Sequence, residues 1–135
     1  MNGMNYEGMI IEESLENIHI LSQVKILETK VEPVTDEHKT PWVNKWTLHT
    51  IEIEENKADE ISSIISKALD TEHDWYVDYR NYKFHYVIYS DKVFKIDRSK
   101  SYLYEEIKKY GLSKGIPEYQ LDFSYHIGEW KRNNP

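Results

Sequence analysis

Three neighbouring segments place one histidine between two aspartates if they fold as adjacent antiparallel strands. A two-residue turn at 81–82 would pair Asp78 with His85, and a three-residue turn at 90–92 would bring Asp97 to the other side of His85. A carboxylate orients an imidazole and raises its pKa, and one histidine with two aspartates is a competent ligand set for a divalent metal. The row therefore predicts general-base chemistry at His85, with Asp78 and Asp97 as its catalytic partners.

The same row is also typical of a solvated sheet face that carries paired charges. Opposite charges that face each other across exposed strands contribute only about 0.2–1 kcal/mol per pair. A one-residue change in either turn would separate the three side chains, because it moves a strand's residues to the opposite face. In the catalytic interpretation, Arg98 or Lys95 would steady an anion beside His85.

Other histidines and aromatic residues favour a binding interpretation. Glu72-His73-Asp74 precedes the first of these strands, and loops at strand ends often carry binding residues. His49 shares its strand parity with Ile51 and Ile53, which is also typical of a hydrogen-bonded core histidine. Exposed tyrosines mark protein interfaces. The candidate ligand- or partner-binding residues are Trp42, Tyr76, Tyr82, His49, His73 and Arg98.

Hydrophobic periodicity predicts the elements that must position these residues. Strands are expected near 9–11, at 24–31, 46–54, 75–80, 84–88 and 94–96, and at 119–127; helices are expected at 58–69 and 102–110. Pro33 ends the second strand and Gly111 stops the second helix. This order, βββαβββαβ, predicts an α+β two-layer sandwich with an antiparallel or mixed sheet of about six to seven strands and two helices on one face.

The strands at 75–80 and 84–88 define the expected faces of the sheet. One face carries six apolar or aromatic side chains, to which the three-residue turn at 90–92 adds two more: Trp75, Val77, Tyr79, Phe84, Tyr86, Ile88, Phe94 and Ile96. Two amphipathic helices would cover that face. The opposite, polar face would then stay uncovered and invite a partner protein or a second copy of the chain.

Length and composition restrict the classes of protein. The chain has 135 residues, 39% of them hydrophobic, with 18 aromatic residues, and this predicts one α+β domain over 1–135 with frayed ends at 1–7 and 130–135. The absence of cysteine excludes disulfides and thiolate metal sites. Without a long apolar run or a basic leader, we expect a cytoplasmic protein that does not contact a membrane.

Charge argues against nucleic acid as a partner. Residues 1–70 carry 6 basic and 14 acidic side chains, whereas residues 71–135 carry 11 and 10. This acidic balance lacks the basic surface that supplies most affinity for phosphate backbones. The glycine-rich phosphate-binding motifs and the Gly-x-Ser-x-Gly and His-Glu-x-x-His signatures are also missing from the sequence.

The remaining hypotheses are a binding module and an enzyme. By elimination we expect a small acidic cytosolic protein without catalytic activity, which binds a partner protein or a small ligand through the uncovered sheet face and the 35–45 loop. The alternative is a small hydrolase or lyase that uses His85 with Asp78 or Asp97, with or without a metal. The sequence requires no cofactor, and a divalent metal is compatible with it.

Overall fold

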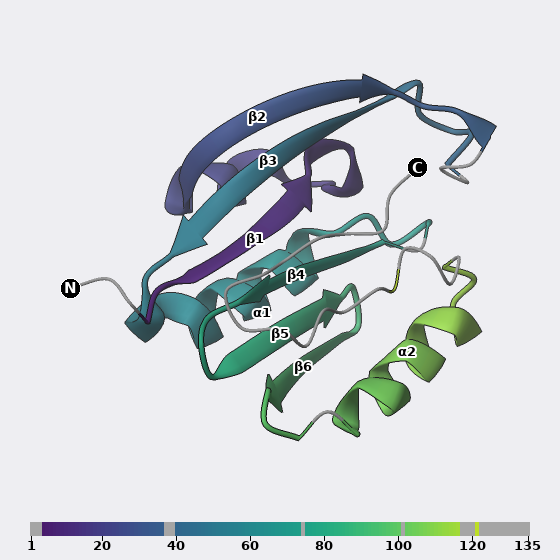
Figure 1. Ribbon diagram of the computed structural model, residues 1–135. Coiled ribbons are helices and arrows are strands. Elements are labelled where there is room, and N and C mark those ends of the chain that lie inside the picture. The colour runs from purple at the N-terminus through teal and green to yellow at the C-terminus, as the bar shows by residue number, and fades with distance from the viewer. Residues whose placement is uncertain (1–3, 37–39, 74, 101, 117–120, 122–135) are drawn as a thin grey trace.

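The fold is built on one twisted antiparallel sheet. The computed structural model describes residues 4–36, 40–73, 75–100, 102–116 and 121 (Figure 1). Six strands are hydrogen-bonded in the order β2-β3-β1-β4-β5-β6. Their bounds are β1 Tyr6–Ile11, β2 Lys25–Pro33, β3 Lys45–Ile53, β4 Tyr76–Arg80, β5 Phe84–Tyr89 and β6 Lys92–Asp97.

The helices follow the third and sixth strands. They are α1 (Ala58–Ala68) and α2 (Leu103–Ser113), and the chain also forms short 3₁₀ helices at η1 (Glu12–Ser14), η2 (Ile18–Gln23) and η4 (Glu55–Lys57). This element order confirms the predicted α+β sandwich up to the second helix. The strand expected at 119–127 and the end expected to fray at 130–135 lie outside the described residues. The first strand begins at Tyr6, so the fraying expected through residue 7 is wrong there.

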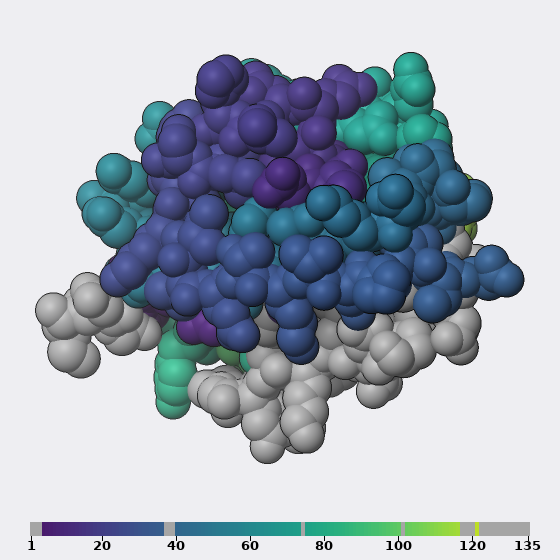
Figure 2. All heavy atoms as spheres, turned by 90° about the horizontal axis from the view of Figure 1, so that it is seen from above, coloured from purple at the N-terminus to yellow at the C-terminus, as the bar shows by residue number. Residues whose placement is uncertain are grey.

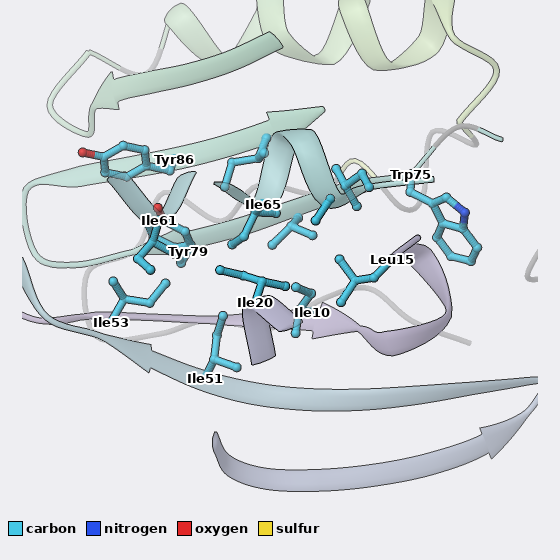
Figure 3. Packing of buried hydrophobic residues seen from close by; sticks show 14 of the residues in the cluster. Ile10, Leu15, Ile20, Ile51, Ile53, Ile61, Ile65, Trp75, Tyr79 and Tyr86 are labelled. Carbon is cyan, nitrogen blue, oxygen red and sulfur yellow. The ribbon is translucent and has the colours of Figure 1, made fainter. Parts of the chain in front are cut away.

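One face of the sheet packs against α1. The helix turns an apolar stripe toward the sheet, and the alternating residues of β1, β3, β4 and β5 meet it. Figure 3 shows these side chains converging from helix and strands. Among them are Ile10, Ile51, Ile53, Ile61, Ile65, Tyr79 and Tyr86. The predicted apolar face of the central hairpin is thus confirmed.

The second helix lies on the opposite face, which corrects the expectation that both helices share one. A second cluster joins Val87 and Tyr89 of β5 and Ile96 of β6 to Tyr104 and Ile107 of α2. In Figure 1, α1 passes behind β4, whereas α2 lies at the lower right beside β6. The β5–β6 turn contains two residues, 90–91, instead of three, so Phe94 and Ile96 point to the α2 side. The face expected to be polar and uncovered is therefore covered in part by α2.

Two glycines allow close approaches that set these layers. A Cβ atom on Gly8 would lie 2.1 Å from the backbone oxygen of Asp78, so only glycine lets β1 pair with β4 at this point. Gly111 does not stop α2 as expected. It lies within the helix, where a Cβ would come 2.8 Å from the Tyr89 hydroxyl. The helix ends at Ser113, and a Schellman motif follows, formed by Gly115 with its φ of 94° and by the bond from the Ile116 N–H to the Gly111 carbonyl.

Within the described part of the chain, no helix combines the length and the apolar character that crossing a membrane requires.

Candidate functional site: two histidine–aspartate pairs

His85 lies in a hydrogen-bonded cluster between the sheet and α2. Its Nε2 atom is 2.8 Å from Oδ2 of Asp78 on β4, and its Nδ1 atom is 2.9 Å from the hydroxyl of Tyr104 on α2. The exposed fractions are 0% for His85, 1% for Asp78 and 2% for Tyr104. These three residues are called the buried cluster below.

Burial sets the protonation of the buried cluster. Burial lowers the pKa of His85 against the opposing effect of the Asp78 carboxylate, and burial raises the pKa of Tyr104 to about 12. At neutral pH the Tyr104 hydroxyl is therefore protonated and donates to Nδ1 of a neutral His85. The Nε2–H group of His85 then donates to Asp78. The ring is thus held as one tautomer by its two neighbours.

The structure brings Asp78 and His85 together through a register that differs from the predicted one. His85 pairs with Arg80 and Asp78 pairs with Val87, so Asp78 and His85 are diagonal neighbours instead of directly opposed. The connection spans residues 81–83, one residue longer than expected, because the Asn81 side chain accepts from the backbone N–H groups of Lys83 and Phe84. The shift of two residues keeps each side chain on its expected face.

Two arginines lie close to the buried cluster. Arg80 pairs with His85 across β4 and β5, and Arg98 donates from Nη1 to the Asn81 carbonyl at 2.7 Å. Both are nearly buried, with exposed fractions of 9% and 8%. Burial and the Arg98 guanidinium lower the pKa of Arg80 to about 10, although Asp78 acts against them, so Arg80 remains charged at neutral pH. The buried carboxylate of Asp78 thus lies in a positive surrounding.

Asp97 and Lys95 do not belong to this cluster. Because the β5–β6 turn has two residues, Asp97 pairs with Phe84 and faces the α1 side of the sheet, away from His85. The Asp97 carboxylate instead accepts from the backbone N–H and the hydroxyl of Ser99. Lys95 lies over the rings of Phe84 and Tyr86 on the same side. The predicted row of one histidine between two aspartates is therefore reduced to one pair.

A second histidine–aspartate pair lies at the surface. Nδ1 of His73 is 2.8 Å from Oδ2 of Asp70, and the indole of Trp42 stacks on the His73 ring with centroids 3.9 Å apart and an interplanar angle of 11°. The exposed fractions are 41% for Trp42 and 30% for the His73 side chain. Burial would raise the pKa of Asp70, but hydrogen bonds from His73 and from the Glu72 N–H lower it overall. Trp42, His73 and Asp70 are called the exposed cluster below.

Buried neighbours hold the exposed cluster in place. Trp75 contacts Trp42 edge-on and also lies beside Trp46, with centroids 6.0 Å apart in each case. The Asp70 N–H donates to the Ser14 carbonyl, and the Glu16 carboxylate accepts from the Thr71 N–H. The connector between α1 and β4 is thereby tied to the segment that contains η1. The partner of His73 is Asp70, and Asp74 of the segment Glu72-His73-Asp74 lies outside the described residues.

The other predicted binding residues lie apart from both clusters or have structural contacts. His49 is 7% exposed, and its ring nitrogens lie 2.8 Å from the Thr29 hydroxyl and from a Glu12 carboxylate oxygen. Tyr76 packs beside Tyr89, with ring centroids 6.0 Å apart. Tyr82 is 59% exposed in the β4–β5 turn. Arg98 belongs to the surroundings of the buried cluster, as described above.

Tyr104 and Arg80 were not among the site residues predicted from the sequence. Tyr104, Ile107 and Gly111 are the buried residues of α2, and this i, i+3, i+7 spacing was a usable signal. Leu103 and Tyr110 of α2 pack against the same cluster but are only partly buried. Arg80 gave no such signal, because an arginine at the end of a strand is most often exposed.

No group of three or more metal-binding side chains occurs among the described residues. The metal site hypothesised at Asp78, His85 and Asp97 is therefore not supported by their arrangement. Comparison with known proteins finds no matching family model, no similar curated protein and no similar solved structure.

Proposed function

We propose that this protein is a non-catalytic, cytoplasmic binding module that holds a partner protein at the exposed cluster. The observation that carries the proposal is the stack of Trp42 on His73, in which a large aromatic side chain is both exposed and fixed. Tryptophan dominates the binding energy of many interfaces. Because the stack and Trp75 already orient Trp42, binding would lose little side-chain entropy.

Charge suggests the chemistry of the partner. Asp70 and Glu16 place carboxylates along the connector that carries His73, and residues 1–70 are acidic as a whole. An indole ring attracts cations over its face. A partner that presents arginine or lysine side chains would meet both features, and complementary charge would speed the association of the two proteins.

The alternative function, a hydrolase or lyase that uses His85, requires a substrate to reach His85. The Tyr104–His85–Asp78 chain has the connectivity of a proton relay, but its histidine is 0% exposed and both ring nitrogens are occupied by protein atoms. A hydrogen-bonded group sealed in this way stabilises the packing of α2 on the sheet. The burial of His85 therefore favours the binding module over the enzyme.

Affinity capture tests the proposal. The protein is immobilised and exposed to cell extract, in parallel with Trp42→Ala and with Tyr82→Ala, which removes an exposed aromatic ring elsewhere. We expect the wild type and Tyr82→Ala to retain the same partner, and Trp42→Ala to lose it by at least about tenfold. Raised salt should weaken the capture, because the partner is basic.

The measurement of thermal midpoints for all three proteins shows whether each variant is folded. Equal capture by folded Trp42→Ala and by the wild type would contradict the proposed site. Loss of capture by Tyr82→Ala as well would place the contact elsewhere on the surface.

A further inference from the structure

The outer strand β2 forms one edge of the sheet. It hydrogen-bonds to β3 on one side, and all of its residues except Glu32 are exposed. Three of the exposed side chains are apolar: Ile26, Leu27 and Val31, with exposed fractions of 41%, 45% and 58%. Figure 2, the view from above, shows this strand as a blue band across the surface. No described strand pairs with its other edge, and an edge of this kind is a template for pairing with another strand.

The side chains in the middle of β2 are complementary to those of a second copy of β2 that runs in the opposite direction. If two copies pair antiparallel about a twofold axis at Thr29, Thr29 faces itself and Glu28 faces Lys30 of the second copy. Leu27, which lies in the register irregularity of β2, and Val31 lie at the two ends of this pairing. Each acidic residue within the pairing thus meets a basic one.

We infer that two copies of this chain associate through antiparallel pairing of β2, which joins their sheets into one. Glu28 and Lys30 are exposed, and within the described part of the chain neither forms an ion pair, so both charges are available to the second copy. Directly opposed charges of unlike sign stabilise a strand pair, whereas like charges destabilise it.

Other registers fit less well. An axis at Lys30 would oppose the two Lys30 side chains and bring Glu28 against Glu32. An axis at Val31 would oppose Lys30 to Glu32, but Glu32 already has a partner in its own chain. That axis would also centre the pairing two residues from Pro33, which has no N–H to donate. The register about Thr29 is therefore the one that charge and backbone both favour.

The ends of the segment limit the pairing to one strand pair. The register irregularity between Ile26 and Glu28 bounds it on one side and Pro33 bounds it on the other. A twofold pairing uses the same edge on both copies, so it closes as a dimer and does not continue into a fibre. Because the paired segment is short, we expect a weak dimer that forms at high protein concentration.

Sedimentation velocity over about 10 µM to 1 mM tests the inference. The wild type should shift from monomer to dimer across this range. Lys30→Glu and Glu28→Lys each oppose like charges and should stay monomeric alone. An equimolar mixture of the two should form a heterodimer, because the two acidic side chains of one variant then face the two basic side chains of the other. The exposed charge changes Lys57→Glu and Glu60→Lys are matched controls and should dimerise like the wild type.

The outcomes separate this inference from the proposed function. Trp42→Ala should dimerise normally, because it leaves β2 unchanged. A wild type that remains monomeric at the top of this concentration range would overturn the inference. So would a dimer that both charge variants form as well as the wild type, or two monomeric variants that do not recover a dimer when mixed.

Discussion

The buried cluster and the exposed cluster contain the same kinds of groups in different surroundings. Each has a histidine nitrogen 2.8 Å from an aspartate oxygen and an aromatic residue against the imidazole. In the buried cluster the histidine is 0% exposed and its second nitrogen is bonded to Tyr104. In the exposed cluster the histidine side chain is 30% exposed and its ring face is covered by Trp42.

A histidine–aspartate pair thus acquires its role from the groups that surround it. Inside the protein, removing one partner leaves a polar group without its hydrogen bond and without water, which is costly. At the surface, water replaces the lost bond and little stability is lost. The buried pair therefore stabilises the fold, whereas the exposed pair lies where we propose that a partner binds.

The largest expected effect comes from removing the imidazole of the buried cluster. His85→Ala takes away the donor to Asp78 and the acceptor of the Tyr104 hydroxyl, and should lower the free energy of unfolding by about 3 kcal/mol or more. His73→Ala in the exposed cluster should lower it by less than about 1 kcal/mol. Urea denaturation followed by circular dichroism measures both. Equal losses in the two variants would erase the distinction between the clusters.

A smaller loss is expected when only the hydroxyl of the buried cluster is removed. Tyr104→Phe keeps the ring packed between α2 and the sheet but leaves Nδ1 of His85 without its donor. It should lower the free energy of unfolding by about 1–3 kcal/mol. The matched change Tyr82→Phe, at an exposed ring, should leave stability within about 0.5 kcal/mol of the wild type. Denaturant midpoints at constant m-value compare the two. No loss in Tyr104→Phe would mean that the hydroxyl does not contribute.

The pH dependence of stability should show the depressed pKa of His85. Below its ordinary value of 6.5, the unfolded chain takes up a proton at this histidine while the folded chain does not, so stability is complete above pH 6.5 and falls as the pH decreases. Between about pH 7.5 and 5.5 the expected contribution is about 1 kcal/mol. The free energies of unfolding of the wild type and His85→Gln, measured at both pH values, give this contribution by difference. The same pH dependence in both proteins would contradict a lowered pKa of His85.

The smallest effect on stability is expected at the aromatic residue of the exposed cluster. Trp42→Ala removes a stacking contact worth about 0.5–1.5 kcal/mol, part of which water recovers. The same change should abolish partner capture. Differential scanning fluorimetry compares the thermal midpoint of Trp42→Ala with that of the wild type. A drop in stability as large as that of His85→Ala would show that Trp42 is a structural residue.

Local periodicity was sufficient for most of the fold. The alternation through 46–54 and 84–88 and the apolar stripe of 58–69 predicted the elements that the structure shows at 45–53, 84–89 and 58–68, and the apolar face that they form. The pattern within a strand does not report the length of the turn that follows. The two-residue turn at 90–91 therefore reversed the faces of Phe94, Ile96 and Asp97 and moved α2 to the opposite side.

The candidate site was predictable only in part. Asp78 and His85 were brought together correctly because their strands are consecutive and the error in register was even. The stack of Trp42 on His73 joins two loops that are distant in the chain, and no periodic pattern reports such a contact. Arg80 was overlooked because an arginine at the end of a strand is most often exposed, whereas here the residue is 9% exposed.

The state of the His85 ring in solution tests most directly whether this histidine is a buried structural group. Nitrogen-15 NMR of the imidazole between about pH 5.5 and 8 reports its tautomer, its charge and the exchange of its ring proton with water. We expect a neutral ring with a slowly exchanging proton on Nε2 and no titration near the ordinary pKa of 6.5, because burial lowers the pKa of His85. An imidazole that becomes protonated near that value and exchanges at the rate of a solvated ring would contradict it, and would return His85 to the list of accessible catalytic groups.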